Sequence, residues 1–313
     1  MQNRSISGNE NRNLWSIVLA GGEGMRLRSL TRALHGEEIP KQYAHIVGEQ
    51  SLLQSTVARA LSWSAPEQIV VIVASDREAR ARSQLASFGA LHLIPQPRNL
   101  GTGPGILLPL SAVLAHEPDA IAVVLPSDHF VREEEPFRET IASSERRARE
   151  SGAVVLVGAV PDSPDPQYGW IVPRRGDSGR LYVECFEEKP NETVAQRLLD
   201  KGALWNTFVL VGPAKRFWEL GAAHLPEQTR ALDVFRQDGM LQKRELVWHA
   251  YEALRPGDFS RDVLERADGL EVMPLPECGW SDWGTPERVL ASLRGTPEFG
   301  RLRQCLRSQP AAI

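Results

Sequence analysis

Short runs of apolar, largely β-branched residues recur along the first half of the chain, separated by stretches with helical character. The runs are SIVLA at 16–20, IVVIVA at 69–74, IAVVLP at 121–126 and AVVLVGAV at 153–160. Continuous apolar runs of this length are typical of strands buried on both faces of a parallel sheet, whose connections are helical crossovers. The sequence therefore predicts an α/β fold in which helices cover both faces of a mostly parallel sheet.

The rest of the chain divides into helices and a second set of strands. Helices are expected at 51–62, 77–88, 105–116 and 136–151, over most of 215–270, and as a closing helix at 286–293. From about Tyr168 onward, GWIVPRR and RLYVECFEEKP have the alternating pattern of strands around the turn GDSG, and EVMPLP has the pattern of a further strand. This second set predicts a small antiparallel insertion on the parallel core.

Composition excludes several classes of partner. Of the 313 residues, 42% are hydrophobic and 24% are charged, and the net charge of −4 provides no positive field for nucleic acid. Residues 1–13 are polar, and no later apolar run is long enough to cross a bilayer. The three cysteines form no close pair, which suits a reducing compartment. We therefore expect a cytoplasmic protein that binds neither a membrane nor nucleic acid.

A glycine-rich segment, LAGGEGMRL at 19–27, directly follows the first predicted strand. Glycines at 21, 22 and 24 let backbone N–H groups turn toward a phosphate without obstruction by Cβ atoms. The spacing matches neither the dinucleotide fingerprint nor a Walker loop. Taken alone, the segment is equally compatible with a plain tight turn between a strand and a helix.

Two cationic residues accompany this loop. Arg26 adds a guanidinium fork, and Lys41 follows the proline of IPKQ at 39–42. Such groups can neutralise the charge that develops as pyrophosphate leaves. A lone lysine is more often a surface residue, so this interpretation depends on the segments that follow.

These residues resemble the opening signature of the sugar-phosphate nucleotidyltransferase family, in which a strand is followed by L-A-G-G-x-G-x-R-L and then by P-K. Later blocks resemble the mannose-1-phosphate guanylyltransferase branch of that family, in the expected order. They are PKQY at 40–43, PRNLGTGPGI at 97–106, LPSDH at 125–129, YGWI at 168–171, EKP at 188–190, WNT at 205–207 and GWSDWG at 279–284.

The resemblance implies a domain organisation. It covers residues 14–293 and implies the Rossmann-like fold of the nucleotide-diphospho-sugar transferases, with a sugar-binding insertion at about 165–285. A disordered N-terminus over 1–13 and a C-terminal tail over 294–313 are expected to flank this domain.

The chain departs from the family pattern at several positions. Met25 stands where the loop usually has threonine, and Gly103 and Gly105 replace the alanines of T-A-P-A. The family's W-N-S-G-M-F is here WNTFVL at 205–210, so that Phe208 replaces a glycine. We expect this last change to reshape the sugar pocket and the changed loop to bear on the choice of base.

The resemblance also implies roles for individual residues. Arg26 and Lys41 are the expected catalytic residues. The expected nucleotide-binding residues are Leu19, Ala20, Gly21, Gly22, Gly24, Asn99, Gly101, Thr102 and Asp128, and the expected sugar-phosphate-binding residues are Gly169, Glu188, Lys189, Asn206 and Asp262. From residue chemistry alone, Lys189 is more often a salt-bridged strand end.

Asp128 and Asp282 lie far apart in the sequence, at predicted strand ends beside small residues. Carboxylate oxygens are hard ligands, and magnesium commonly combines one or two of them with waters and substrate phosphates. Either aspartate alone is more often a turn former or a helix cap, but the resemblance implies that both hold Mg²⁺. His129 is left outside the metal set, because a lone histidine at a strand end more often makes a local hydrogen bond.

The reaction implied is transfer of a nucleoside monophosphate from a nucleoside triphosphate, with GTP favoured, to a sugar 1-phosphate, with mannose 1-phosphate favoured. Pyrophosphate leaves and a nucleotide sugar forms. These two substrates are the expected partners, and a homodimer is left open. Two alternatives remain, namely the same chemistry with another base or sugar phosphate, and a non-catalytic regulatory subunit that binds nucleotide sugars.

Overall fold

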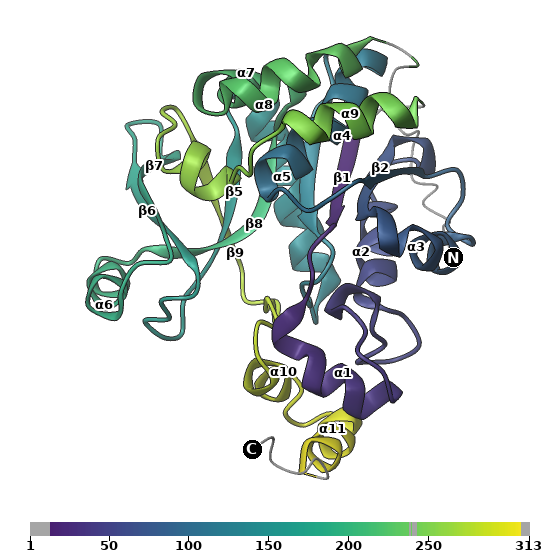
Figure 1. The fold of residues 1–313 in the computed structure, drawn as a ribbon. Coiled ribbons are helices and arrows are strands. Elements are labelled where there is room, and N and C mark those ends of the chain that lie inside the picture. The colour runs from purple at the N-terminus through teal and green to yellow at the C-terminus, as the bar shows by residue number, and fades with distance from the viewer. Residues whose placement is uncertain (1–12, 238, 240–242, 308–313) are drawn as a thin grey trace, which may run out of the picture.

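A nine-stranded sheet in the order β3-β2-β1-β4-β8-β5-β9-β7-β6 runs through the computed structural model, which describes residues 13–237, 239 and 243–307 (Figure 1). The strands are β1 (Leu14–Ala20), β2 (Ile69–Ala74), β3 (His92–Gln96), β4 (Ile121–Pro126), β5 (Val155–Ala159), β6 (Gly169–Arg175), β7 (Leu181–Glu188), β8 (Leu204–Pro213) and β9 (Glu271–Leu275). The four strands at one end, β3 to β4, pair in parallel. The α/β fold predicted from the apolar runs, which form β1, β2, β4 and β5, is confirmed.

Beyond β4 the sheet is mixed. β8 pairs antiparallel with both β4 and β5, whereas β5 pairs in parallel with β9. The expected insertion over about 165–285 therefore supplies two strands, β8 and β9, to the central sheet as well as an appendage. The appendage is the antiparallel β6–β7 hairpin with α6 (Glu192–Asp200), which projects to one side (Figure 1).

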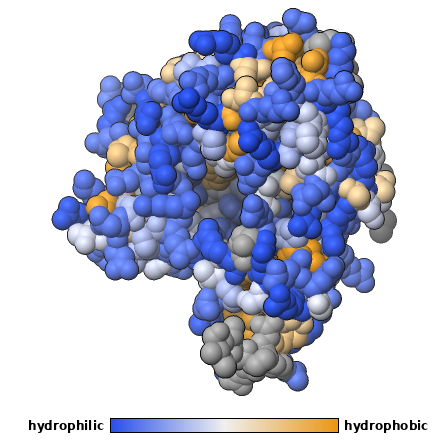
Figure 2. All heavy atoms as spheres, in the orientation of Figure 1, coloured by the Kyte–Doolittle hydropathy of each residue, from blue (hydrophilic) through white to orange (hydrophobic). Residues whose placement is uncertain are grey.

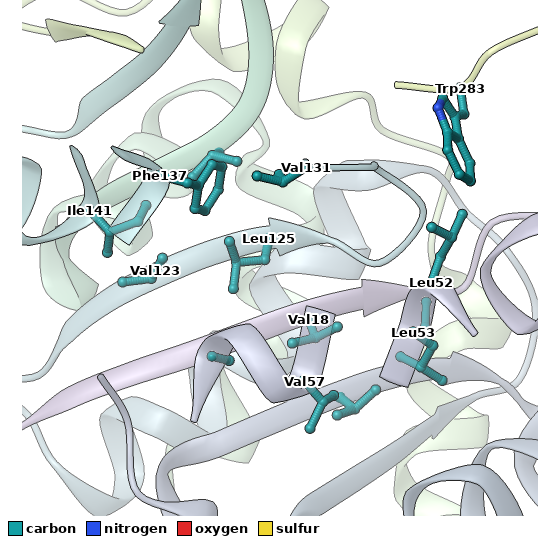
Figure 3. Packing of buried hydrophobic residues seen from close by; sticks show 14 of the residues in the cluster. Val18, Leu52, Leu53, Val57, Val123, Leu125, Val131, Phe137, Ile141 and Trp283 are labelled. Carbon is teal, nitrogen blue, oxygen red and sulfur yellow. The ribbon is translucent and has the colours of Figure 1, made fainter. Parts of the chain in front are cut away.

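Helices cover both faces of the sheet, because side chains along the central strands point alternately to either side. Within β1, Ile17 and Val18 are fully buried and belong to two different core clusters. The cluster of Val18 includes side chains from α2 (Leu52–Ala60), α3 (Glu78–Leu85), α5 (Glu134–Ser151) and α10 (Pro286–Ser292). Figure 3 shows part of the packing in this cluster. The cluster of Ile17 includes α4 (Thr102–His116), α7 (Ala214–His224), α8 (Pro226–Leu232) and α9 (Arg244–Ala253).

The two ends of the chain differ in what the structure describes. The expected disordered segment, 1–13, lies outside the described residues except for Asn13. Part of the expected tail, 294–313, forms α11 (Pro297–Arg307), which packs against α1 (Arg28–His35). Among the described residues, no helix combines the length and the apolar character that a membrane span requires.

Candidate functional site

The loop after β1 is fixed by glycine and by Gln42. Gly24 has a φ of +59°, and a Cβ atom there would lie 2.6 Å from the backbone N of Lys41. Nε2 of Gln42 donates to the carbonyl oxygens of Ala20 at 3.1 Å and Gly22 at 2.6 Å. Both carbonyls are therefore satisfied by a side chain of the protein, and these hydrogen bonds hold the backbone of the predicted phosphate loop in place.

Lys41 connects three segments that are distant in the sequence. It lies in the 3-10 helix η2 (Lys41–Tyr43), and its side chain is only 8% exposed. Nζ is 3.0 Å from Oδ2 of Asp128 and donates to the backbone carbonyl of Asp282 at 2.5 Å. The end of β4 and the turn that carries Asp282 therefore meet at one ammonium group.

A pocket of about 250 Å³ lies at this junction. It is lined by Gly24, Arg26, Leu27, Lys41, Asp128, His129, Asp282, Trp283 and Gly284. The structure thus brings the loop, both predicted catalytic cations and both predicted metal ligands to one place. Figure 2 shows a hollow near the middle of a largely hydrophilic face.

The two aspartates of the pocket favour the charged form. Burial opposes ionisation of Asp128, but the Lys41 ammonium and His129 beside it hold the pKa of this carboxyl below its usual value. Burial also opposes ionisation of Asp282, and there His129 and Arg288 lower the pKa. Both side chains are therefore carboxylates at neutral pH, which a cation site of oxygen ligands requires.

No cluster of three or more His, Cys, Asp or Glu side chains suited to a metal ion occurs in the part of the chain that the structure describes. Two carboxylates with room beside them are a donor set that fits Mg²⁺ when substrate phosphates and waters complete its shell. The residues present therefore fit a magnesium ion that is bound together with a nucleotide.

Three of the predicted nucleotide-binding residues, Asn99, Gly101 and Thr102, lie at the start of α4. The backbone N of Gly101 donates to Oδ1 of Asn99 at 2.9 Å, and Oγ1 of Thr102 accepts from the backbone N of Phe259 at 2.7 Å. The loop around Gly257 closes on this turn, since its N donates to the Leu100 carbonyl at 2.9 Å. A Cβ atom on Gly101 would lie 2.4 Å from the Gly257 carbonyl oxygen.

The two glycines that replace family alanines have different surroundings. A Cβ atom on Gly103 would lie 2.7 Å from Cδ1 of Leu225 and 3.0 Å from the Gly257 carbonyl oxygen, whereas one on Gly105 would meet nothing within 4 Å. We expect Gly105→Ala to raise the free energy of unfolding by up to about 1 kcal/mol, because alanine is the better helix former. Gly103→Ala should lower it by about 1–3 kcal/mol through overpacking.

Urea unfolding of the two variants checks this prediction, and each serves as the matched control for the other, since both lie in the first turns of α4. An increase in stability for Gly103→Ala would contradict the close approach of the Gly257 loop.

Three of the predicted sugar-side residues converge. A Cβ atom on Gly169 would lie 2.6 Å from Oε2 of Glu188 and 3.4 Å from Cβ of Asn206. Burial raises the pKa of Glu188 despite the opposing charge of Lys189, whose Nζ lies 3.2 Å from Oε1 of Glu188. The Asp262 side chain makes a local bond instead, because its Oδ2 accepts from the backbone N of Asp258 at 2.7 Å.

Left-handed backbone occurs next to predicted sugar-side residues and next to Asp282 in the pocket. Among the described non-glycine residues, positive φ occurs at Lys189 (+50°), Phe208 (+57°) and Trp283 (+45°). Such conformations cost of order 1–3 kcal/mol each and cluster at functional sites. Phe208 stands where the family pattern has glycine, and it adopts a left-handed conformation that favours glycine.

Several site residues were not assigned from the sequence. Oδ1 of Asp282 accepts from the Tyr168 hydroxyl at 2.7 Å and from Nη1 of Arg288 at 2.8 Å, and Arg288 also pairs with Asp165. His129 also lines the pocket, and its Nε2 lies 3.7 Å from Oδ1 of Asp128. Tyr168 lay within a recognised block, which was the one available signal, whereas nothing in the sequence pointed to Arg288.

Comparison with known proteins gives one family. The sequence profile of the nucleotidyl transferase family matches residues 15–295. Mannose-1-phosphate guanylyltransferase of Escherichia coli K12 is 32% identical over 87% of this chain, and xanthan biosynthesis protein XanB of Xanthomonas campestris strain B100 is 33% identical over 88%. The chain spans only 58% of the length of either relative.

Solved structures agree with this comparison. A crystal structure described as mannose-1-phosphate geranyltransferase from Thermus thermophilus superposes with a TM-score of 0.78 at 28% identity, covering 91% of this chain and 80% of that one.

Proposed function

Because the chain belongs to the nucleotidyl transferase family, we propose that it transfers a nucleoside monophosphate from a nucleoside triphosphate to a sugar 1-phosphate and releases pyrophosphate. GTP and mannose 1-phosphate are the favoured substrates, since relatives that match most of this chain are named for that pair. The observation that carries the proposal is the convergence of the glycine loop, Lys41, Asp128 and Asp282 on one pocket.

The residues of this pocket suit phosphoryl chemistry without a nucleophile from the protein. A sugar phosphate is already an anion at neutral pH, so in-line attack on the α-phosphate requires mainly alignment and neutralisation of charge. The loop from Gly21 to Gly24 would hold the triphosphate. Lys41 would stabilise the departing pyrophosphate from its buried position, and Arg26, at the pocket edge beside Gln167, would stabilise the transferring phosphate.

Asp128 and Asp282 would hold Mg²⁺ at the same place. The ion would neutralise charge on the triphosphate and orient it. The carboxylates are suited to this role because both remain ionised in the pocket.

The sugar phosphate would lie against the segment that joins β7 and β8. Lys189 is half exposed and would pair with the phosphate, while the buried carboxyl of Glu188 and the amide of Asn206 would reach sugar hydroxyls. Gly169 would leave room for the sugar. Phe208 supports a second candidate, the same reaction with another sugar phosphate, because its side chain stands where the family has none.

A pyrophosphate-release screen tests the proposal. The protein is incubated with Mg²⁺ and with each combination of GTP, UTP, CTP, ATP or dTTP and a hexose 1-phosphate. We expect the highest rate for GTP with mannose 1-phosphate and no release after chelation of the metal. A higher rate for another pair would transfer the proposal to the second candidate, and no release from any pair would favour a non-catalytic binding subunit.

A further inference from the structure

Arg288, at the start of α10, holds the Asp282 carboxylate from inside the protein. Nη1 lies 2.8 Å from Oδ1 and 2.9 Å from Oδ2, and Nη2 bonds to Asp165. The guanidinium also lies 4.4 Å from the centre of the Tyr168 ring. With a side chain only 17% exposed, Arg288 is fixed by two carboxylates and an aromatic face.

The two oxygens of Asp282 are bonded unequally. Oδ1 accepts from the Tyr168 hydroxyl at 2.7 Å, from Arg288 and from the backbone N of Gly284 at 3.0 Å. Within the described residues, Oδ2 accepts from Arg288 alone. A carboxylate oxygen has about two lone-pair sites, so Oδ1 is saturated while Oδ2 keeps acceptor capacity.

We propose that Arg288 is a positioning residue that orients Asp282 so that Oδ2 alone serves as the ligand of a divalent cation. This inference rests on the proposed function, which places Mg²⁺ between Asp128 and Asp282. Arg288 is not among the described residues that line the pocket, so it acts only through the carboxylate.

Charge and shape both support a positioning role. Arg288 is shared with Asp165, so the three side chains together keep a charge of −1 and Asp282 still attracts a cation. The contact also requires Gly284, where a Cβ atom would lie 2.7 Å from Nη1 of Arg288 and 2.6 Å from Oδ2 of Asp282. A planar fork can bond two carboxylates at fixed angles, which the single ammonium of lysine cannot do.

The test measures binding of Mn²⁺, as a probe for Mg²⁺, to the protein in the presence of a nucleoside triphosphate. The electron paramagnetic resonance signal of the free ion gives the affinity, and the nucleotide without protein is the blank. We expect Arg288→Lys to weaken Mn²⁺ binding about tenfold, as loss of a group that orients a metal ligand typically does. Arg294→Lys, at an exposed position two residues beyond the end of α10, is the control and should leave the affinity for Mn²⁺ unchanged. Thermal unfolding of each variant shows that the fold is retained.

A double-mutant cycle separates positioning from a general effect on the pocket. In an Asp282→Asn background, Arg288→Lys should cause no further loss of affinity, because its action passes through that carboxylate. Equal Mn²⁺ affinity of Arg288→Lys and the parent, additive losses in the double variant, or no Mn²⁺ binding by the parent would each overturn the proposal.

The proposed function and this inference can fail separately. Coupling between Arg288 and Asp282 in Mn²⁺ binding without pyrophosphate release would keep the inference and reject the reaction. Turnover without such coupling would do the reverse.

Discussion

Lys41→Met is expected to lower the rate of nucleotidyl transfer about a hundred- to a thousandfold, the usual effect of removing one preorganised group that stabilises charge in a transition state. Lys41 is suited to so large a contribution because it is nearly excluded from water and its Nζ is held 3.0 Å from Asp128 and 2.5 Å from the Asp282 carbonyl. The ammonium therefore requires little reorganisation when negative charge develops on the leaving pyrophosphate. Initial rates of pyrophosphate release at saturating substrates measure the effect.

Two further variants show whether the position or the charge of Lys41 matters. Lys41→Arg should recover little of the lost rate, because a longer side chain with a planar head group does not fit the buried position of the ammonium between Asp128 and the Asp282 carbonyl. Lys215→Met, at an exposed lysine on α7, is the control and should match the parent. A Lys41→Met rate within threefold of the parent would remove Lys41 from the catalytic machinery.

The parallel part of the fold could be predicted because burial on both faces leaves a plain trace in the sequence. The runs IVVIVA and IAVVLP coincide with β2 and β4 residue for residue. β3 was not predicted, since its five residues include Pro95 and it lies at the sheet edge, where a missing N–H donor is tolerated. β8 was not predicted either, because its apolar run continues from a block interpreted only as part of the sugar site.

The site shows a similar division. Residues in contiguous blocks, such as Lys41 and Asp128, could be predicted to share a pocket because each block carries a recognisable pattern. The partners of Asp282 were not found. Tyr168 lies 114 positions before Asp282, and Asp165 lies 123 positions before Arg288. No local spacing in the sequence indicates interactions that form only through tertiary packing.

Asp128→Asn and Asp282→Asn are each expected to lower turnover about a hundred- to a thousandfold, since asparagine keeps the shape of the side chain but removes the charge that a divalent cation requires. The Mg²⁺ concentration for half-maximal rate should rise in both variants. In Asp282→Asn, the amide NH₂ could face the donors of Tyr168, Gly284 and Arg288, which it cannot accept from. In the opposite orientation, the amide oxygen would accept from these donors, and the NH₂ would take the place of Oδ2, the oxygen with free acceptor capacity. That variant should therefore be the more severely impaired.

The same pair of variants decides between an enzyme and a binding subunit. A subunit that only binds nucleotide sugars has little need of two ionised carboxylates in one pocket, so its affinity for a nucleotide sugar would change little in either variant. Asp177→Asn, in the exposed turn of the β6–β7 hairpin, controls for loss of a carboxylate elsewhere. Parent-like turnover in both pocket variants would defeat the catalytic assignment, because Asp128 and Asp282 would then meet in the pocket for a structural reason alone.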